Sequence, residues 1–224
     1  MDTDAQKLPE HVSAYRRLRD MILSGQLAPG QAVTIQGLVK TLDSGVTPVR
    51  EAIRRMTSEG ALQFQGNRRV TVPVLGGDQI EELRFARLAL EPELVRKSAE
   101  NMTPAIMDRL SQIDAALNQA IAAGDIQGYM LQNHAFHMQL YGQADYQIVM
   151  PLVQALWLRA APSLRIMCGR FGTQNLPDMH QRALTALRTG DAAAAAQAIS
   201  DDINQGLDNV RAVLALPAAP DPEI

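Results

Sequence analysis

Segments with the pattern of β-strands are confined to one short stretch of this chain, and this feature constrains the fold most. Residues 61–65 (ALQFQ) and 68–74 (RRVTVPV) alternate apolar and polar side chains around a Gly-Asn pair, a pattern typical of a small hairpin. Only 4% of the residues are aromatic, while 46% are apolar. From residue 75 onward, apolar residues recur at helical spacing between turn signals. We therefore predict a mainly α protein with one hairpin.

Three helices are predicted before the hairpin, over residues 11–24, 34–42 and 47–59. Thr34 is a good N-cap for the second helix, and Thr47, followed by a proline, for the third. Ile53 and Met56 form the inner face of the third helix, and Gly60 ends it. Two helices, a turn, a further helix and a hairpin make a winged helix-turn-helix, which we assign to residues 8–75.

The second domain is predicted to be entirely helical and to cover residues 76–215. Residues 216–224 are rich in proline and are expected to be disordered. Six helices are expected in this domain, separated by glycine, proline and other turn residues. They lie near residues 78–100, 104–123, 125–141, 145–171, 176–189 and 191–214.

The charge of the chain is unevenly distributed. Residues 1–75 hold 10 Lys and Arg against 7 Asp and Glu, whereas residues 76–224 hold 11 against 17. A basic amino-terminal domain fits a polyanionic partner. The single Cys168 allows no internal disulfide, and the polar amino terminus has no apolar signal-peptide core. No apolar run approaches the roughly 18 residues of a membrane span, so a cytoplasmic location without membrane contact is expected.

The third predicted helix concentrates positive charge in residues 44–60, SGVTPVREAIRRMTSEG. A helix that follows a helix-turn-helix corner can enter the major groove of double-stranded DNA. Thr47 at its start can then meet a phosphate, Arg50 a base or phosphate, and Arg54 and Arg55 the DNA backbone. The alternative is that these arginines only solvate an exposed helix face.

Residues 18–30 (LRDMILSGQLAPG) and 47–62 (TPVREAIRRMTSEGAL) resemble the DNA-binding domain of the GntR family of bacterial transcription regulators. The resemblance extends over residues 15–74. It departs from the family pattern at Gly45-Val46, which replace Ser-Arg, at Gln36, which replaces an arginine, and at Arg69, which replaces the wing glycine. The resemblance implies a DNA-facing set that comprises Gln36, Thr47, Arg50, Asn67 and Arg68, with Arg69 as a local addition.

The helical remainder is similar to the FCD type of effector domain of the FadR subfamily. This resemblance implies an antiparallel bundle that holds a small ligand and, in many relatives, a divalent metal. The family's metal ligands are an Asp and a His four residues apart, followed by two further His. The segments NHAFHMQL and PDMHQRALTALRTGD place Asn133, His137, His180 and Asp202 at these positions, so that the Asp has become Asn133 and the last His has become Asp202.

Two imidazoles and one carboxylate are a competent ligand set for Zn, Ni, Fe or Mn, with coordination positions left for a ligand's oxygen atoms. Asn133 and His137 share a helix face at i, i+4, and His180 and Asp202 lie on two helices joined by a short turn. A divalent metal is therefore expected. The alternative is that His137 and His180 are hydrogen-bonded interior residues without a metal.

Arg87 corresponds to an arginine that lines the effector cavity in the FCD resemblance. A guanidinium suits bidentate recognition of a carboxylate, so an organic acid that also meets the metal is the expected effector. Arg159 and Arg165 are further candidates for the effector cavity. The alternative for Arg87 is an ion pair with Glu91, one turn later on the same helix.

Together these features predict a homodimeric DNA-binding regulator, more specifically a repressor, whose affinity for operator DNA is controlled by a small-molecule effector. One alternative is a metal sensor in which the ion itself is the effector. A metal-dependent hydrolase is the rival class of protein. The sequence contains no nucleophile elbow and no phosphate-cradling glycine loop, so we expect no enzymatic activity.

Overall fold

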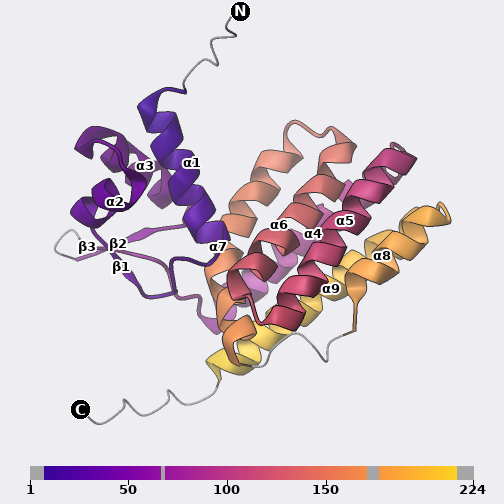
Figure 1. The fold of residues 1–224 in the computed structure, drawn as a ribbon. Helices are drawn as coiled ribbons and strands as arrows, with labels where there is room; N and C mark the ends of the chain where they lie inside the picture. The colour runs from indigo at the N-terminus through magenta and orange to yellow at the C-terminus, as the bar shows by residue number, and fades with distance from the viewer. Residues whose placement is uncertain (1–7, 67–68, 171–176, 216–224) are drawn as a thin grey trace, which may run out of the picture.

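The computed structural model describes residues 8–66, 69–170 and 177–215. Three helices and a small sheet form the amino-terminal part, and a larger helical bundle lies beside it (Figure 1). The expectation of a mainly α protein with a winged helix-turn-helix and an all-α bundle is confirmed. The predicted disordered tail, residues 216–224, lies outside the described residues.

The amino-terminal helices are α1 (Glu10–Leu23), α2 (Ile35–Leu42) and α3 (Val46–Ser58). The Thr34 hydroxyl accepts a hydrogen bond from the Gly37 N–H at 3.0 Å, so the predicted N-cap of α2 is confirmed. Asp43 closes α2 in the left-handed conformation and turns the chain into α3. The inner face of α3 is fully buried, as Ile53 and Met56 predict; its other buried residues are Val49 and Ala52.

The predicted N-cap of α3 is wrong. The cap residue is Gly45, two positions before Thr47, and it has no side chain to accept a hydrogen bond. Glu10 at the start of α1 takes over this role, because its carboxylate accepts from the Gly45 N–H at 2.8 Å and from the Ser44 hydroxyl at 3.1 Å. The Thr47 side chain is therefore not used for capping and stays exposed.

The hairpin consists of β2 (Gln63–Gln65) and β3 (Arg69–Thr71), which pair antiparallel with Phe64 opposite Val70. A two-residue strand that the sequence did not reveal, β1 (Ala32–Val33), pairs with the other edge of β3. The sheet order is therefore β1-β3-β2. The wing is thus tied to the segment that leads into α2.

The bundle contains α4 (Gly77–Ala99), α5 (Pro104–Ala123), α6 (Ile126–Tyr141), α7 (Val149–Arg170), α8 (Met179–Arg188) and α9 (Ala192–Leu214). The expected helices are present with small shifts at their ends. The predicted start at residue 145 is wrong, because a 3₁₀ turn, Gly142–Ala144, is followed by Asp145 with a φ of 53° that no α-helix accommodates. Asp178 caps α8 by accepting from the Gln181 N–H, so this helix starts after residue 176.

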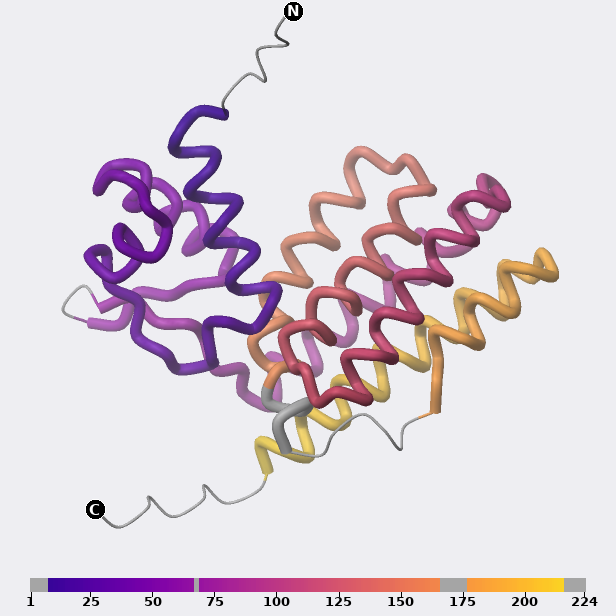
Figure 2. The backbone as a smooth tube through the Cα atoms, in the orientation of Figure 1, coloured from indigo at the N-terminus to yellow at the C-terminus, as the bar shows by residue number. Residues whose placement is uncertain are grey.

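The two parts of the chain meet where α1 packs beside α7 (Figure 2). One apolar core of buried side chains runs through both parts. The Arg159 side chain donates a hydrogen bond to the Glu59 carbonyl oxygen, just beyond α3, at 3.0 Å. Gly25, after α1, lies against the Arg165 side chain. Among the described helices, none combines the length and the apolar character needed to cross a bilayer.

Candidate functional site

The start of α3 is an exposed surface with the properties expected of a DNA contact. Thr47 and Arg50 are exposed, whereas Val49 between them is fully buried. The buried side of the helix therefore fixes which way the exposed side chains face. A helix start with exposed N–H groups and an arginine can meet a phosphate and a base edge at once.

Three other members of the predicted DNA-facing set are exposed on α2, α3 and the wing. Gln36 is exposed in the first turn of α2, and Arg69 is exposed at the first residue of β3. Arg54 is exposed and forms an ion pair with Glu51 at 3.3 Å, which is weak at such exposure. Asn67 and Arg68 at the tip of the wing lie outside the described residues.

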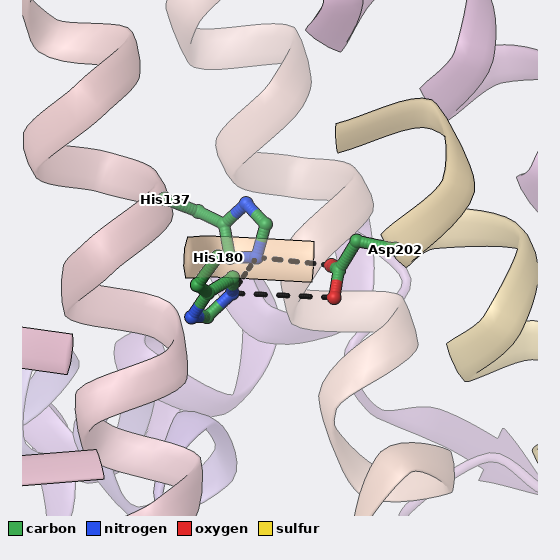
Figure 3. Close-up of side chains that lie close together, drawn as sticks. All are labelled: His137, His180 and Asp202. Atoms are coloured by element: carbon green, nitrogen blue, oxygen red, sulfur yellow. Dashed lines mark hydrogen bonds and ion pairs between the residues drawn. The ribbon is translucent and has the colours of Figure 1, made fainter. Parts of the chain in front are cut away.

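Inside the bundle, three of the predicted metal ligands converge (Figure 3). His137 on α6, His180 on α8 and Asp202 on α9 each offer one ligand atom, and these atoms lie within 4.8 Å of one another. The two Nε2 atoms are 3.2 Å apart, and the His137 Nε2 is 3.2 Å from an Asp202 oxygen. Two nitrogens bound to one tetrahedral zinc ion at about 2.0–2.1 Å lie about 3.3 Å apart. The ligand atoms present therefore fit a single ion.

The hydrogen-bond partners of the two imidazoles explain this convergence. The Tyr141 hydroxyl donates its only hydrogen to a Glu91 oxygen at 2.6 Å, so its oxygen accepts from the His137 Nδ1, 2.9 Å away. A neutral His137 then carries its lone pair on Nε2. That lone pair faces the His180 Nε2 and the Asp202 carboxylate. The His137 lone pair and the Asp202 carboxylate are both acceptors, so a cation, or a hydrogen carried by the His180 Nε2, is needed between these atoms.

Burial and neighbouring charges set the protonation of this cluster. Burial lowers the pKa of His137, although Asp202 acts in the opposite direction, and the neutral imidazole is the form that binds a metal. Burial alone would raise the pKa of Asp202, but the interaction with His137, His180 and Arg87 lowers it to about 2. The carboxylate is therefore charged at neutral pH. A charged carboxylate and a neutral imidazole are both ready to act as ligands.

Arg87 lies deep in the bundle and is already paired. Its guanidinium donates to both oxygens of Glu91 at 2.6 and 3.1 Å, and both side chains are almost fully buried. The Arg87 guanidinium also lies 4.5 Å from the centre of the Trp157 ring. The ion pair that was the alternative to effector binding is thus present, although it is an interior pair rather than a surface one.

A cavity of about 220 Å³ opens beside the cluster between α5, α6, α8 and α9. Asn133, His180 and Asp202 all line it, so the amide that replaces the family's aspartate faces the same space as two ligands. A narrower cavity is lined by Arg87 and Trp157 and again by Asn133 and Asp202. A small molecule in the larger cavity can therefore reach the cluster directly.

Arg159 and Arg165 are not beside the cluster. Arg159 is exposed and bonded to the Glu59 carbonyl oxygen, and Arg165 packs against Gly25. Both side chains thus point from α7 toward the amino-terminal part. Their assignment to the effector cavity is corrected by this geometry, because the rotation of α7 turns Trp157 inward and these arginines outward.

Sequence reasoning missed two side chains that contact the metal cluster from outside. Asp114 on α5 is buried, and its Oδ1 lies 3.4 Å from the His180 Nδ1. Tyr141 lies one turn after His137 on α6 and contacts its Nδ1. The i, i+4 spacing of Tyr141 was a visible signal. Asp114 had none, because its neighbour comes from another helix far along the chain.

Comparisons with known proteins identify the family of each part of the chain. Residues 11–72 match the family described as bacterial regulatory proteins of the gntR family, and residues 82–205 match the FCD domain. The HTH-type transcriptional regulator McbR of Escherichia coli K12 is 31% identical over 150 residues, which cover 67% of this chain and 68% of McbR.

A second relative and a solved structure extend the similarity over nearly the whole chain. The HTH-type transcriptional repressor RspR of Escherichia coli K12 is 24% identical over 209 residues, which cover 92% of this chain and 90% of RspR. The solved structure of Escherichia coli McbR/YncC is similar with a TM-score of 0.84 at 25% identity, and covers 92% of this chain and 98% of that one. This chain and the McbR/YncC structure thus have the same fold, with the helix-turn-helix before the helical bundle.

Proposed function

The chain belongs to the GntR family of bacterial transcription regulators and carries an FCD effector-binding domain. From this premise we propose that it is a homodimeric repressor that senses an organic acid through a metal ion bound in the bundle. The observation that carries the proposal is the pair of sites in one chain. An exposed arginine and threonine start α3, and a cluster of two imidazoles and a carboxylate adjoins a cavity in the bundle.

DNA binding by α3 is supported by exposure and charge. Thr47 and Arg50 are exposed, and the first turn of α3 contains no acidic residue. Two copies of α3 in a dimer would read the two halves of a pseudo-palindromic operator. Phosphate contacts would supply most of the affinity and make it dependent on salt.

A divalent ion at His137, His180 and Asp202 is supported by the separations of the ligand atoms and by their protonation. Asn133 offers a weaker amide oxygen to the same site. Zn, Ni, Fe and Mn all accept such a set of nitrogen and oxygen ligands. When bound, the ion would supply open coordination positions toward the cavity.

An organic acid is the effector class that these groups favour. The two carboxylate oxygens of Glu91 already occupy the Arg87 guanidinium, so we place the acid's carboxylate against the ion rather than against Arg87. Without the ion, the unbalanced carboxylate of Asp202 would repel such a ligand. Binding of the acid is therefore expected to require the metal.

Dimer formation through α4 and the start of α7 is supported by apolar side chains exposed on these two neighbouring helices and at Ile148, directly before α7. Phe85 is 77% exposed, Ile148 is 81% exposed and Leu152 is 53% exposed. Large apolar side chains at this exposure favour a protein partner. A second copy of the chain is the partner that two-fold operator recognition calls for.

Operator release tests the proposal. The purified protein first selects a binding fragment from a random DNA library. Binding of this fragment is then measured with chelator-stripped protein, with protein loaded with Zn²⁺ or Ni²⁺, and with each of these after addition of acetate or citrate. The proposal expects release only when ion and acid are both present. Release by the ion alone would favour the metal sensor, which the ligand cluster also supports. Binding that no combination changes would contradict both.

A further inference from the structure

Each of the two imidazoles in the cluster of His137, His180 and Asp202 has a polar group near its Nδ1, on the side away from the other ligands. The His137 Nδ1 contacts the Tyr141 hydroxyl at 2.9 Å, and the His180 Nδ1 lies 3.4 Å from the Asp114 Oδ1. Asp114 is on α5, is 1% exposed and belongs to none of the candidate sites that the sequence indicates. Burying a carboxylate without compensating hydrogen bonds or charges destabilises the folded state.

We propose that Asp114 is a positioning residue that fixes His180 in the tautomer with hydrogen on Nδ1 and directs the Nε2 lone pair into the cluster. The inference deepens the proposed metal site and rests on it. Asp114 does not touch the ion itself. It acts only through the imidazole of His180.

The hydrogen-bond needs of Asp114 lead to this assignment. One of its oxygens, Oδ2, accepts from the Gln181 side-chain amide at 2.9 Å. The other, Oδ1, is buried and has no hydrogen-bond partner among the described residues, and the His180 Nδ1 lies 3.4 Å from it. A charged carboxylate oxygen is an acceptor only, so the hydrogen must be on the histidine. Carboxylates that bind the outer nitrogen of metal-binding histidines in this way raise their basicity and fix their orientation.

The ring of His180 is also held in its plane. Phe136 stacks on it with the ring centres 4.0 Å apart and an angle of 11° between the planes. Stacking limits tilting of the imidazole, but it does not distinguish the two nitrogens. Phe136 therefore sets the plane of the ring, and Asp114 sets which nitrogen is free to bind.

The partner of the other imidazole differs in charge. His137 faces a hydroxyl, and this hydroxyl is bonded in turn to the carboxylate of Glu91. His180 instead faces a carboxylate directly. Neutralising Asp114 should therefore disturb His180 and leave the tautomer of His137 unchanged.

The tautomers can be read directly from two-bond ¹H–¹⁵N NMR spectra of the full-length protein at pH 8. In the chelator-stripped wild type, His180 is expected in the Nδ1–H form. This measurement needs no variant, so it tests the proposal even if a substitution at Asp114 prevents folding. A His180 signal in the Nε2–H form would overturn the proposal.

The second arm measures affinity for Zn²⁺ by chelator competition in wild type, in Asp114→Asn and in Asp108→Asn. Asp108 is exposed on the same helix, so it is a matched control. Asp114→Asn is expected to weaken Zn²⁺ binding about 10- to 100-fold. It should also populate the Nε2–H form of His180, with no change in the tautomer of His137. Asp108→Asn should match the wild type.

The outcomes separate this inference from the metal site on which it rests. If the wild type binds Zn²⁺ and Asp114→Asn binds it equally well, the role of Asp114 is refuted and the metal site stands. If the wild type binds none of Zn²⁺, Ni²⁺ or Mn²⁺, the metal site is refuted, and the wild-type tautomer still decides whether Asp114 holds His180.

Discussion

At the start of α3, Thr47 and Arg50 are exposed, whereas the imidazoles of His137 and His180 are buried in the bundle, with polar side chains close to both nitrogens of each ring. The difference reflects the size of the partner. A DNA duplex supplies its own phosphates and base edges, so the protein needs only a supported, exposed helix start. A single ion supplies no directional groups, so the protein must hold every ligand in place beforehand.

Salt should separate the two regions most strongly. If α3 binds DNA through phosphates, operator affinity measured by fluorescence anisotropy should fall about 10³- to 10⁵-fold between 50 and 200 mM salt, as for proteins that make roughly 6–10 phosphate contacts. Affinity for Zn²⁺ in the buried cluster should hardly change over this range. If operator affinity and Zn²⁺ affinity depended equally on salt, the distinction between an exposed DNA-binding surface and a buried ion site would be contradicted.

Metal removal should affect only the bundle. Zn²⁺ at 100 times its Kd should raise the free energy of unfolding by about 2.7 kcal/mol, which a thermal melt of the stripped protein detects. The variant His180→Ala should lose this stabilisation because a ligand is missing. His11→Ala, which removes an exposed histidine of α1, is the control and should retain it. Absence of stabilisation by every divalent ion would contradict the metal site.

Arg50→Ala should affect only the DNA-facing surface. Loss of one base contact costs about 1–3 kcal/mol, or roughly 5- to 150-fold in specific affinity, and gel shifts with operator and scrambled DNA measure it. Arg211→Ala, on the exposed side of α9, should bind like the wild type. Zn²⁺ affinity should be unchanged in both variants. Undiminished specific binding by Arg50→Ala would remove this residue from the proposed surface.

Glu10→Ala should weaken the support of α3 rather than its contact surface. The carboxylate of Glu10 caps the helix start at the Gly45 N–H, and loss of such a cap costs about 1 kcal/mol. Chemical denaturation should report this loss, with Glu93→Ala on α4 as the control for an exposed helical glutamate. If stability is unchanged, the cap contributes nothing in solution.

Arg159→Ala should have the smallest effect. Its hydrogen bond to the Glu59 carbonyl oxygen is exposed, so its loss should lower stability by only about 0.5 kcal/mol. Because the side chain points away from the cluster, Zn²⁺ affinity should equal that of the wild type. A weaker affinity for Zn²⁺ in this variant would restore Arg159 to the effector site.

The fold was predictable where a segment carries its own local signals. Thr34 caps α2 by accepting from the N–H of Gly37, three residues later. Gly60 follows the end of α3 with a φ of 76°, and Ile53 and Met56 mark the inner face of that helix. Features that depend on distant partners were not predictable. The cap of α3 comes from Glu10, 35 residues earlier, and β1 exists only because β3 provides a partner.

The site was predictable to a lesser degree. The spacing of Asn133 and His137 places them on one helix face, but His180 and Asp202 were assigned through the family resemblance. The carboxylate of Asp114 gave no signal, because its role depends on how α5 packs against α8. Arg159 and Arg165 were assigned to the wrong side of α7, since the rotation of a helix with apolar residues all around cannot be fixed from spacing alone.

The shared apolar core at the junction of α1 and α7 has a consequence for how a signal would reach DNA. Ala14 and Leu18 on α1 and Ala161 on α7 belong to the same buried cluster, and close packing of this kind resists bending between its parts. In the proposed dimer, each protomer should then turn as one rigid body. A rotation of a few degrees where two bundles meet would move the tip of α3 in proportion to its distance from the axis, and the spacing between the two DNA-reading helices would change without any hinge inside the chain.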